Sequence, residues 1–139
     1  MNDPKRPTTP TVTLSDGEWK LMKLLWEKEP RSIAEMVGAL SRDTGWTKTT
    51  VFVMLKRLIA KGAVRVDDTG RIQQYYPVIT RADVVPAETD SFLDRVFDGS
   101  VGMMMSSLAG RNALKEEDIA ALRKIIADAE RNLDKNGGN

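Results

Sequence analysis

The spacing of hydrophobic residues predicts three short helices in the first half of the chain. The first two begin at capping boxes, in which a serine is followed three residues later by a glutamate. These pairs are Ser15 with Glu18 and Ser32 with Glu35. Behind each box, apolar side chains recur at intervals of three and four residues, the period of one helix face. Pro30 ends the first helix, and residues 41–45 (SRDTG) are predicted to form a loop after the second.

The third predicted helix contains TKTTVFVMLKRL at 47–58 and has two unlike faces. Thr47 is its predicted N-cap, and it runs to about Lys61 with Gly62 at its C-terminal cap. At about 100° per residue, one face is apolar, with Phe52 at its margin. Its members are Val51, Met54, Leu55 and Leu58. The opposite face mixes hydroxyl groups, cations and a bare valine, so it is not an ordinary solvated surface. It holds Thr49, Thr50, Val53, Lys56 and Arg57.

After Gly62 the period changes from that of a helix to that of a strand. Val64 and Val66 alternate with an arginine, a turn follows at 67–70, and the alternation resumes at positions 72, 74 and 76. This pattern predicts a β-hairpin. Three helices followed by a hairpin is the order of a winged helix-turn-helix, and a generic helical domain with one hairpin is the alternative.

The last third of the chain is predicted to be helical again. A linker at 81–90 (RADVVPAETD) leads to helices near 91–109 and 115–134. The second helix carries an apolar stripe that two helices cannot bury by themselves, so it packs either against the first domain or against a second subunit. We favour a dimer. The predicted interface residues are Phe92, Val96, Phe97, Ile119, Leu122, Ile126 and Ala129.

These elements predict a mainly α fold with a small β-hairpin wing. A winged helix-turn-helix domain at 13–82 is followed by a helical dimerisation domain at 83–135. The residues outside both domains, 1–12 and 136–139, are expected to be disordered tails.

Two absent residue types limit the chemistry open to this 139-residue chain. Without cysteine it has no disulfide, thiolate nucleophile or cysteine-based zinc site, and without histidine it lacks the commonest general base and metal ligand. It also has no paired-carboxylate spacing and no glycine-rich phosphate loop. The sequence therefore predicts a protein that is not an enzyme and holds no cofactor or metal.

No hydrophobic run approaches the length of a membrane span, about 18 to 20 residues. The N-terminal stretch MNDPKRPTTPTV lacks the apolar segment of a secretory signal. A cytoplasmic protein with no membrane partner is expected.

Positive charge is concentrated around the third helix and the hairpin. The whole chain carries only +1, but residues 48–71 hold six cations and two carboxylates, which leaves +4. Residues 72–139 hold eight cations and eleven carboxylates, which leaves −3. Clustered cations are expected where a protein binds phosphates, although such a segment is also common on a solvated surface.

The outer face of the third helix has the chemistry expected of a helix that enters the DNA major groove. Hydroxyl groups can meet base edges, an apolar group can meet a thymine methyl, and flanking cations can reach phosphates. Thr49 and Val53 are predicted to face bases, with Lys56 next to them. Backbone contacts are predicted for Thr47, Lys48, Thr50 and Arg57 on the helix and for Arg65 and Arg71 on the wing. The alternative for Val53 is a scattered surface hydrophobe.

Several stretches also resemble the penicillinase repressor (BlaI/MecI) family. They are SDGEWKLMKLLW, GWTKTTVFVMLKRLIAKG, GRIQQYYPVI, FLDRVF and EEDIAALRKII, in this order over roughly residues 12–130. The resemblance implies a winged-helix homodimeric transcriptional repressor that binds a dyad DNA operator. It also implies that the helix at 47–61 reads the groove and that the helices within 91–134 form the dimer.

The chain departs from the family pattern in three places. Family members commonly carry a basic residue near Thr49 and Phe52, so base readout is expected to differ. Copper-responsive relatives end in a cysteine-rich motif, which this chain lacks. In antibiotic-responsive relatives a sensor-linked protease cuts an Asn-Phe bond, and the matching residues here are Ser107 and Leu108. A sensor-linked protease is therefore a possible partner, and 107–108 a possible release site.

Two other functions stay open from the sequence alone. A winged helix can serve as a protein-interaction scaffold that never touches DNA, and a repressor of this size can sense a small molecule between its domains. Salt dependence separates the first of these from a DNA reader, because each phosphate contact releases counterions and makes binding weaken with salt.

Overall fold

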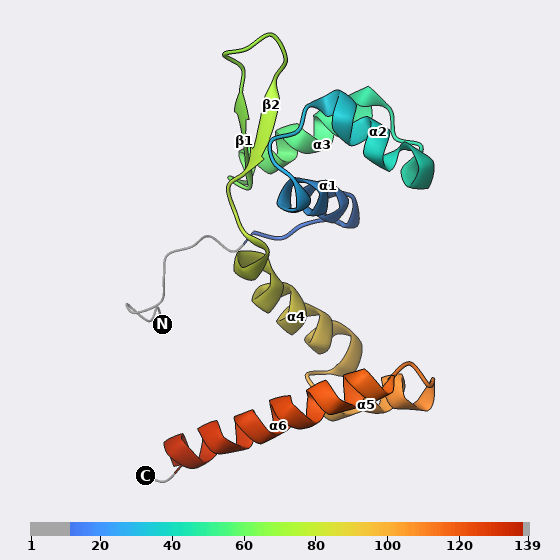
Figure 1. Ribbon diagram of the computed structural model, residues 1–139, viewed down its shortest axis with the longest axis vertical. Coiled ribbons are helices and arrows are strands. Elements are labelled where there is room, and N and C mark those ends of the chain that lie inside the picture. Colours follow the sequence, from blue (N-terminus) through green and yellow to red (C-terminus); the bar gives the residue numbers. More distant parts are fainter. Residues whose placement is uncertain (1–11, 138–139) are drawn as a thin grey trace. The chain divides into compact units, whose positions relative to one another are not determined.

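The structure, a computed structural model, describes residues 12–137 (Figure 1). Its elements are α1 (Asp16–Glu27), α2 (Ile33–Thr44), α3 (Lys48–Ala60), β1 (Val64–Asp67), β2 (Gln74–Pro77), α4 (Arg81–Phe97), α5 (Val101–Gly110) and α6 (Glu116–Gly137). By packing, the chain divides into two compact units, one ending at Thr89 and the other beginning at Asp90. The predicted class, mainly α with a small hairpin wing, is confirmed.

The predicted tails fall mostly outside the described residues. Of residues 1–12, only Val12 is described, and it packs against the core of the first unit. Of residues 136–139, only the first two are described, and they are the last residues of α6.

Both predicted capping boxes form and fix where α1 and α2 begin. In each, the serine Oγ accepts a hydrogen bond of 3.2 Å from the glutamate backbone N–H. The glutamate Oε1 accepts one from the serine N–H in return, at 2.8 Å for Glu18 and 3.0 Å for Glu35. Two of the backbone donors that a helix leaves unpaired at its start are thereby satisfied in each case.

The second helix is longer than expected. The sequence predicted a loop at 41–45, which is wrong for most of this stretch because α2 continues to Thr44. Gly45 then ends the helix in the left-handed region with φ of 66°, and its N–H donates to the Ser41 carbonyl. Short polar residues can occupy a last helical turn, and a glycine directly after it supplies the conformation that closes the helix.

The third helix begins as predicted but ends one residue earlier, at Ala60, with Lys61 rather than Gly62 as its cap. At its start, Thr47 Oγ1 accepts a hydrogen bond from the Thr50 N–H at 3.2 Å. Gly62 follows with φ of 78°, a conformation that a residue with a side chain rarely adopts. The chain thus turns directly from α3 into β1.

The hairpin forms, but its second strand pairs one residue out of step with the predicted pattern. The antiparallel register joins Val66 to Tyr75 and Val64 to Pro77, so Tyr75 is the buried residue of β2. The sequence instead grouped positions 72, 74 and 76 with the valines. Because side chains alternate across a strand, a shift of one residue moves each of them to the other face. The backbone of Tyr75 also exchanges two hydrogen bonds with Arg31, which attaches the hairpin to the segment before α2.

The first unit has one hydrophobic core, made by α1, α2, α3, the hairpin and the start of α4. Its fully or nearly fully buried side chains include Leu21, Met22, Leu25, Met36, Val51, Leu55, Leu58, Val64, Tyr75 and Val84. Figure 1 shows the hairpin projecting beyond the three helices as a wing. This core fixes which side of α3 faces solvent.

The predicted linker at 81–90 is wrong, because α4 already begins at Arg81. Thr80 Oγ1 accepts from the Asp83 N–H at 3.1 Å, and Asp83 Oδ2 accepts from the Thr80 N–H at 2.8 Å. Pro86 lies inside the helix and removes one backbone donor. Burial of Val84 favours the helix against that cost. Val84 packs into the first core, and the compact unit that contains it runs to Thr89. The functional domain boundary predicted at residue 82 stays a prediction.

Candidate nucleic-acid interface

The helix α3 presents its predicted outer face to solvent. Every residue that the sequence assigned to DNA contact on this helix is exposed. They are Thr47, Lys48, Thr49, Thr50, Val53, Lys56 and Arg57. On the opposite side, Val51, Leu55 and Leu58 are fully buried, so the rotation of the helix about its axis is fixed by the core. The structure therefore supports the exposure of these residues, and their contacts with DNA stay a prediction.

Two of the predicted contact residues also have a structural role. The hydroxyl of Thr47 caps α3 and lies 3.2 Å from the hydroxyl of Thr50. Each hydroxyl retains capacity for at least one more hydrogen bond, because a hydroxyl has one donor and two acceptor sites. The start of α3 is therefore rigid and still able to contact a phosphate.

Phe52 belongs to the exposed face, which the sequence reading missed. Its side chain is 39% exposed, although the helical period placed it at the margin of the buried face. Lys56, one turn further along, holds its Nζ 5.3 Å from the centroid of the Phe52 ring. For a residue at the border between the buried and exposed faces of a helix, its position on the helical wheel does not decide whether its side chain is buried. That depends on whether a neighbouring element covers the residue, and none covers Phe52.

The wing carries its two predicted arginines in different settings. The guanidinium of Arg65 lies over the Tyr76 ring, 3.9 Å from its centroid, on the face of the hairpin away from the core. Arg71 is exposed in the loop between the strands. Asp67, the last residue of β1, accepts hydrogen bonds from the side chain and backbone of the loop residue Thr69, at 2.6 and 3.0 Å. These hydrogen bonds lower the pKa of the Asp67 carboxyl, which keeps it charged and orders the turn.

A surface hollow brings Lys48 and Arg71 together, which the sequence could not indicate. It has a volume of about 370 Å³ and is lined by the start of α2 (residues 32–34), Lys48 at the start of α3, and the wing residues 71–73. The N-terminal ends of α2 and α3 lie at this hollow, and each carries a partial positive charge from its helix dipole. Lys48 and Arg71 add two full positive charges. The hollow is therefore an electropositive concavity shared by α2, α3 and the wing.

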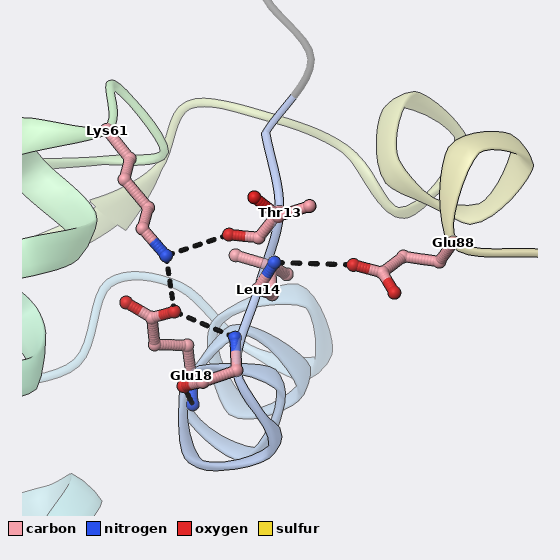
Figure 2. A network of polar contacts seen from close by, with 6 residues as sticks. Thr13, Leu14, Glu18, Lys61 and Glu88 are labelled. Carbon is pink, nitrogen blue, oxygen red and sulfur yellow. Dashed lines mark hydrogen bonds and ion pairs between the residues drawn. The ribbon is translucent and has the colours of Figure 1, made fainter. Parts of the chain in front are cut away.

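A polar network attaches the end of α3 to the start of α1 (Figure 2). Lys61 Nζ donates to Glu18 Oε1 at 2.6 Å and to the Thr13 carbonyl at 2.8 Å. The next residue of this segment, Leu14, donates its N–H to Glu88 Oε1 of α4 at 3.3 Å. Burial by itself raises the pKa of Glu18, but the hydrogen bonds from Lys61 and Ser15 outweigh it and lower the pKa overall. Glu18 is therefore a buried carboxylate that stays charged because of its partners.

The second unit exposes its apolar residues. None of the residues 90–136, the part of this unit whose burial the structure describes, is buried within the chain. An open groove of about 550 Å³ lies between α5 and α6, and three of the predicted interface residues line it: Ile119, Leu122 and Ile126. Phe92 and Phe97 contact each other edge to face with ring centroids 6.0 Å apart, while Val96 and Ala129 are exposed. The predicted interface residues are thus available to a partner.

The family model of the penicillinase repressor matches residues 14–128, which is most of the chain. The chain belongs to the penicillinase repressor family. The penicillinase repressor of Bacillus licheniformis is 31% identical over 115 residues, which cover 83% of this chain and 90% of that protein. The methicillin resistance regulatory protein MecI of Staphylococcus aureus strain N315 is 23% identical over 116 residues, which cover 84% of this chain and 94% of that protein.

A solved structure, the DNA-binding domain of the repressor BlaI, is also similar. It is 34% identical, covers 53% of this chain and 90% of that chain, and superposes with a TM-score of 0.48. Members of the penicillinase repressor family are DNA-binding transcriptional repressors and not enzymes, so the predicted family and the predicted absence of enzymatic activity are both confirmed.

Membership of the penicillinase repressor family does not test the predicted release site, the predicted protease partner or the predicted cellular location. Ser107 and Leu108 lie within the helix α5, and a sensor-linked protease as partner stays a prediction. Within residues 12–137, no helix combines the length and apolarity needed to cross a membrane. The cytoplasmic location expected from the sequence stays a prediction as well.

Proposed function

We propose that this chain is a homodimeric transcriptional repressor that reads the major groove of a dyad operator with α3. The observation that carries the proposal is the exposed face of α3, where hydroxyl and apolar side chains are flanked by Lys48, Lys56 and Arg57. An α-helix fits the major groove, and residues near its N-terminus reach base edges. The core behind α3 holds this face outward without any rearrangement.

The hollow shared by α2, α3 and the wing is proposed to receive a backbone phosphate. Lys48 and Arg71 supply the charge, and the unpaired N–H groups of the first turn of α2 supply donors. A phosphate here would fix the register of α3 along the duplex without reading its sequence. Arg65, stacked on Tyr76, is proposed to contact the backbone or the adjacent minor groove.

Two copies of the chain are proposed to associate through the second unit. Leaving the apolar groove between α5 and α6 exposed to water is energetically unfavourable. In a two-fold dimer the same surface of a second copy would cover it. One winged helix reads a half-site. A two-fold dimer reads two half-sites, about 34 to 36 Å apart for one turn of DNA.

Replacing Lys56 or Arg57 with alanine is expected to weaken binding and to make it less dependent on salt. Each lost phosphate contact should reduce the slope of log affinity against log salt by about one per subunit. The measurement is a titration of the full-length chain, at several salt concentrations, against a duplex selected from a random pool. Lys23→Ala, an exposed lysine of α1, is the matched control and should leave the slope unchanged. A chain that selects no duplex sequence would contradict the proposed function.

Neutralising both wing arginines is expected to weaken binding to any duplex. Arg65 and Arg71 are proposed to contact the backbone, so their loss should lower affinity about equally for the selected operator and for random duplex. Two phosphate contacts also predict a slope shallower by about 1.8 per subunit. The same titrations, with both kinds of duplex, measure this. A loss confined to the operator would show instead that the wing reads bases.

A further inference from the structure

Two neighbouring apolar side chains, Phe52 and Val53, are exposed in the middle of the cationic face of α3. Phe52 is 39% and Val53 is 43% exposed. The residues on either side of the pair, Val51 and Met54, are buried in the core. The exposure is therefore imposed by a well-packed helix, and it does not arise from loose packing.

The setting of Phe52 restricts what could bind it. Lys56 lies 5.3 Å from its ring centroid, and Lys48, Thr49 and Arg57 are exposed on the same helix. A phenyl ring has no hydrogen-bonding group, so apart from a cation over its face, which Lys56 already supplies here, it recognises an apolar surface or another ring. The surrounding cations favour a partner that is itself negatively charged. The partner must therefore present a small apolar group within an anionic surface.

We propose that Phe52, with Val53 beside it, recognises the C5-methyl group of a thymine in the major groove. This rests on the proposed groove reading by α3. Thymine is the base that offers an apolar group at the major-groove edge, and contacts of Phe and other apolar side chains with that methyl are a known form of readout. Duplex DNA is also the polyanion that the flanking cations fit. Phe52 is accordingly a specificity-determining residue, and Lys56 beside its ring reaches toward a phosphate.

Replacing thymine by deoxyuridine tests the proposal, because it removes the methyl and leaves every hydrogen-bonding group in place. The operator is first selected from random duplexes with the full-length chain. Each thymine of the half-site is then replaced in turn, symmetrically in both half-sites. At one or two positions the wild-type chain should lose about fourfold in affinity per half-site, the effect of one buried methyl group. For Phe52→Ala, the thymine and deoxyuridine duplexes should bind equally at those positions.

Three further variants test whether Phe52 itself recognises the thymine methyl group or only positions Lys56. Phe52→Leu keeps an apolar side chain and should retain part of the discrimination. Lys56→Ala should weaken both duplexes equally. Val78→Ala removes an exposed apolar residue that follows β2 and is not part of α3, and it should change neither affinity nor discrimination.

Two results would overturn the proposal. If no thymine is sensitive to loss of its methyl in the wild-type chain, Phe52 does not read one, even though the selected operator shows that the chain reads DNA. If Phe52→Ala weakens both duplexes equally and keeps the sensitivity, Phe52 only supports Lys56, or it serves a protein partner. Failure to select any operator would instead contradict the function on which the proposal rests.

Discussion

A chain with Ile126→Asp is expected to be monomeric, in contrast to the dimer proposed for the wild-type chain, and to bind the full operator about 10² to 10⁴-fold more weakly. Ile126 is 56% exposed and lines the groove between α5 and α6, so an aspartate is tolerated in the single chain but would bury a charge in the dimer. The loss of affinity follows because two linked half-site readers make the second binding event intramolecular. Sedimentation velocity and operator titrations measure the two effects.

Two other chains control this experiment. Ala127→Asp places the same side chain one residue along, on another side of α6, and should remain dimeric. A chain ending at Leu108 lacks α6 altogether and should be monomeric with a folded first unit. Circular dichroism checks that the two aspartate variants keep their helices and that the shortened chain loses only the helicity of its missing residues. A tight dimer with full operator affinity in both Ile126→Asp and the truncated chain would place the interface elsewhere.

Lys61→Met is expected to destabilise the first unit at neutral pH by about 1 to 3 kcal/mol, because it leaves the carboxylate of Glu18 buried without its cation. Glu18 is 2% exposed, and among the described residues its Oε2 has no hydrogen-bond partner that could compensate. All three tryptophans of the chain, Trp19, Trp26 and Trp46, lie in this unit, so urea unfolding followed by fluorescence measures the effect. Lys23→Met, on the exposed side of α1, should cost little.

The same contact predicts how stability depends on pH. Since the folded state lowers the pKa of Glu18, its contribution is fully present above the unfolded value near 4.5 and is lost as pH falls through the lower folded value. The difference between wild type and Lys61→Met should therefore shrink in acid. Adding Glu18→Gln to Lys61→Met removes the unpaired charge and should restore part of the stability at neutral pH. A difference that stays constant down to acid would show that the charge pair is not its source.

Features set by local chemistry could be predicted from the sequence alone. The two capping boxes, the cap at Thr47 and Gly62 after α3 each depend on residues within four positions of one another. The outward face of α3 follows from the helical period, because a buried stripe such as Val51, Leu55 and Leu58 determines its opposite. The apolar stripe of the last helix predicted a dimer, and the segments that resemble the penicillinase repressor family implied the same dimer and added the dyad operator as an expectation.

Tertiary structure decided the features in which distant segments meet. The loop between β1 and β2 sets the register, so whether Tyr75 or Tyr76 is buried depends on pairing across the hairpin. The helical start of α4, despite Pro86, depends on Val84 entering a core built from earlier residues.

The features that bear most on the proposed function and on the stability of the first unit also arise between distant segments. Lys48 and Arg71 share a hollow only after the wing folds beside α2, and Lys61 reaches Glu18 across 43 residues of sequence. Phe52 is exposed because no element covers it. The period and caps of a helix depend on neighbouring residues, so they can be predicted from the sequence. Burial, charge pairing and strand register depend on contacts between distant segments, and the distance between two segments along the chain does not tell how close they lie in the folded structure.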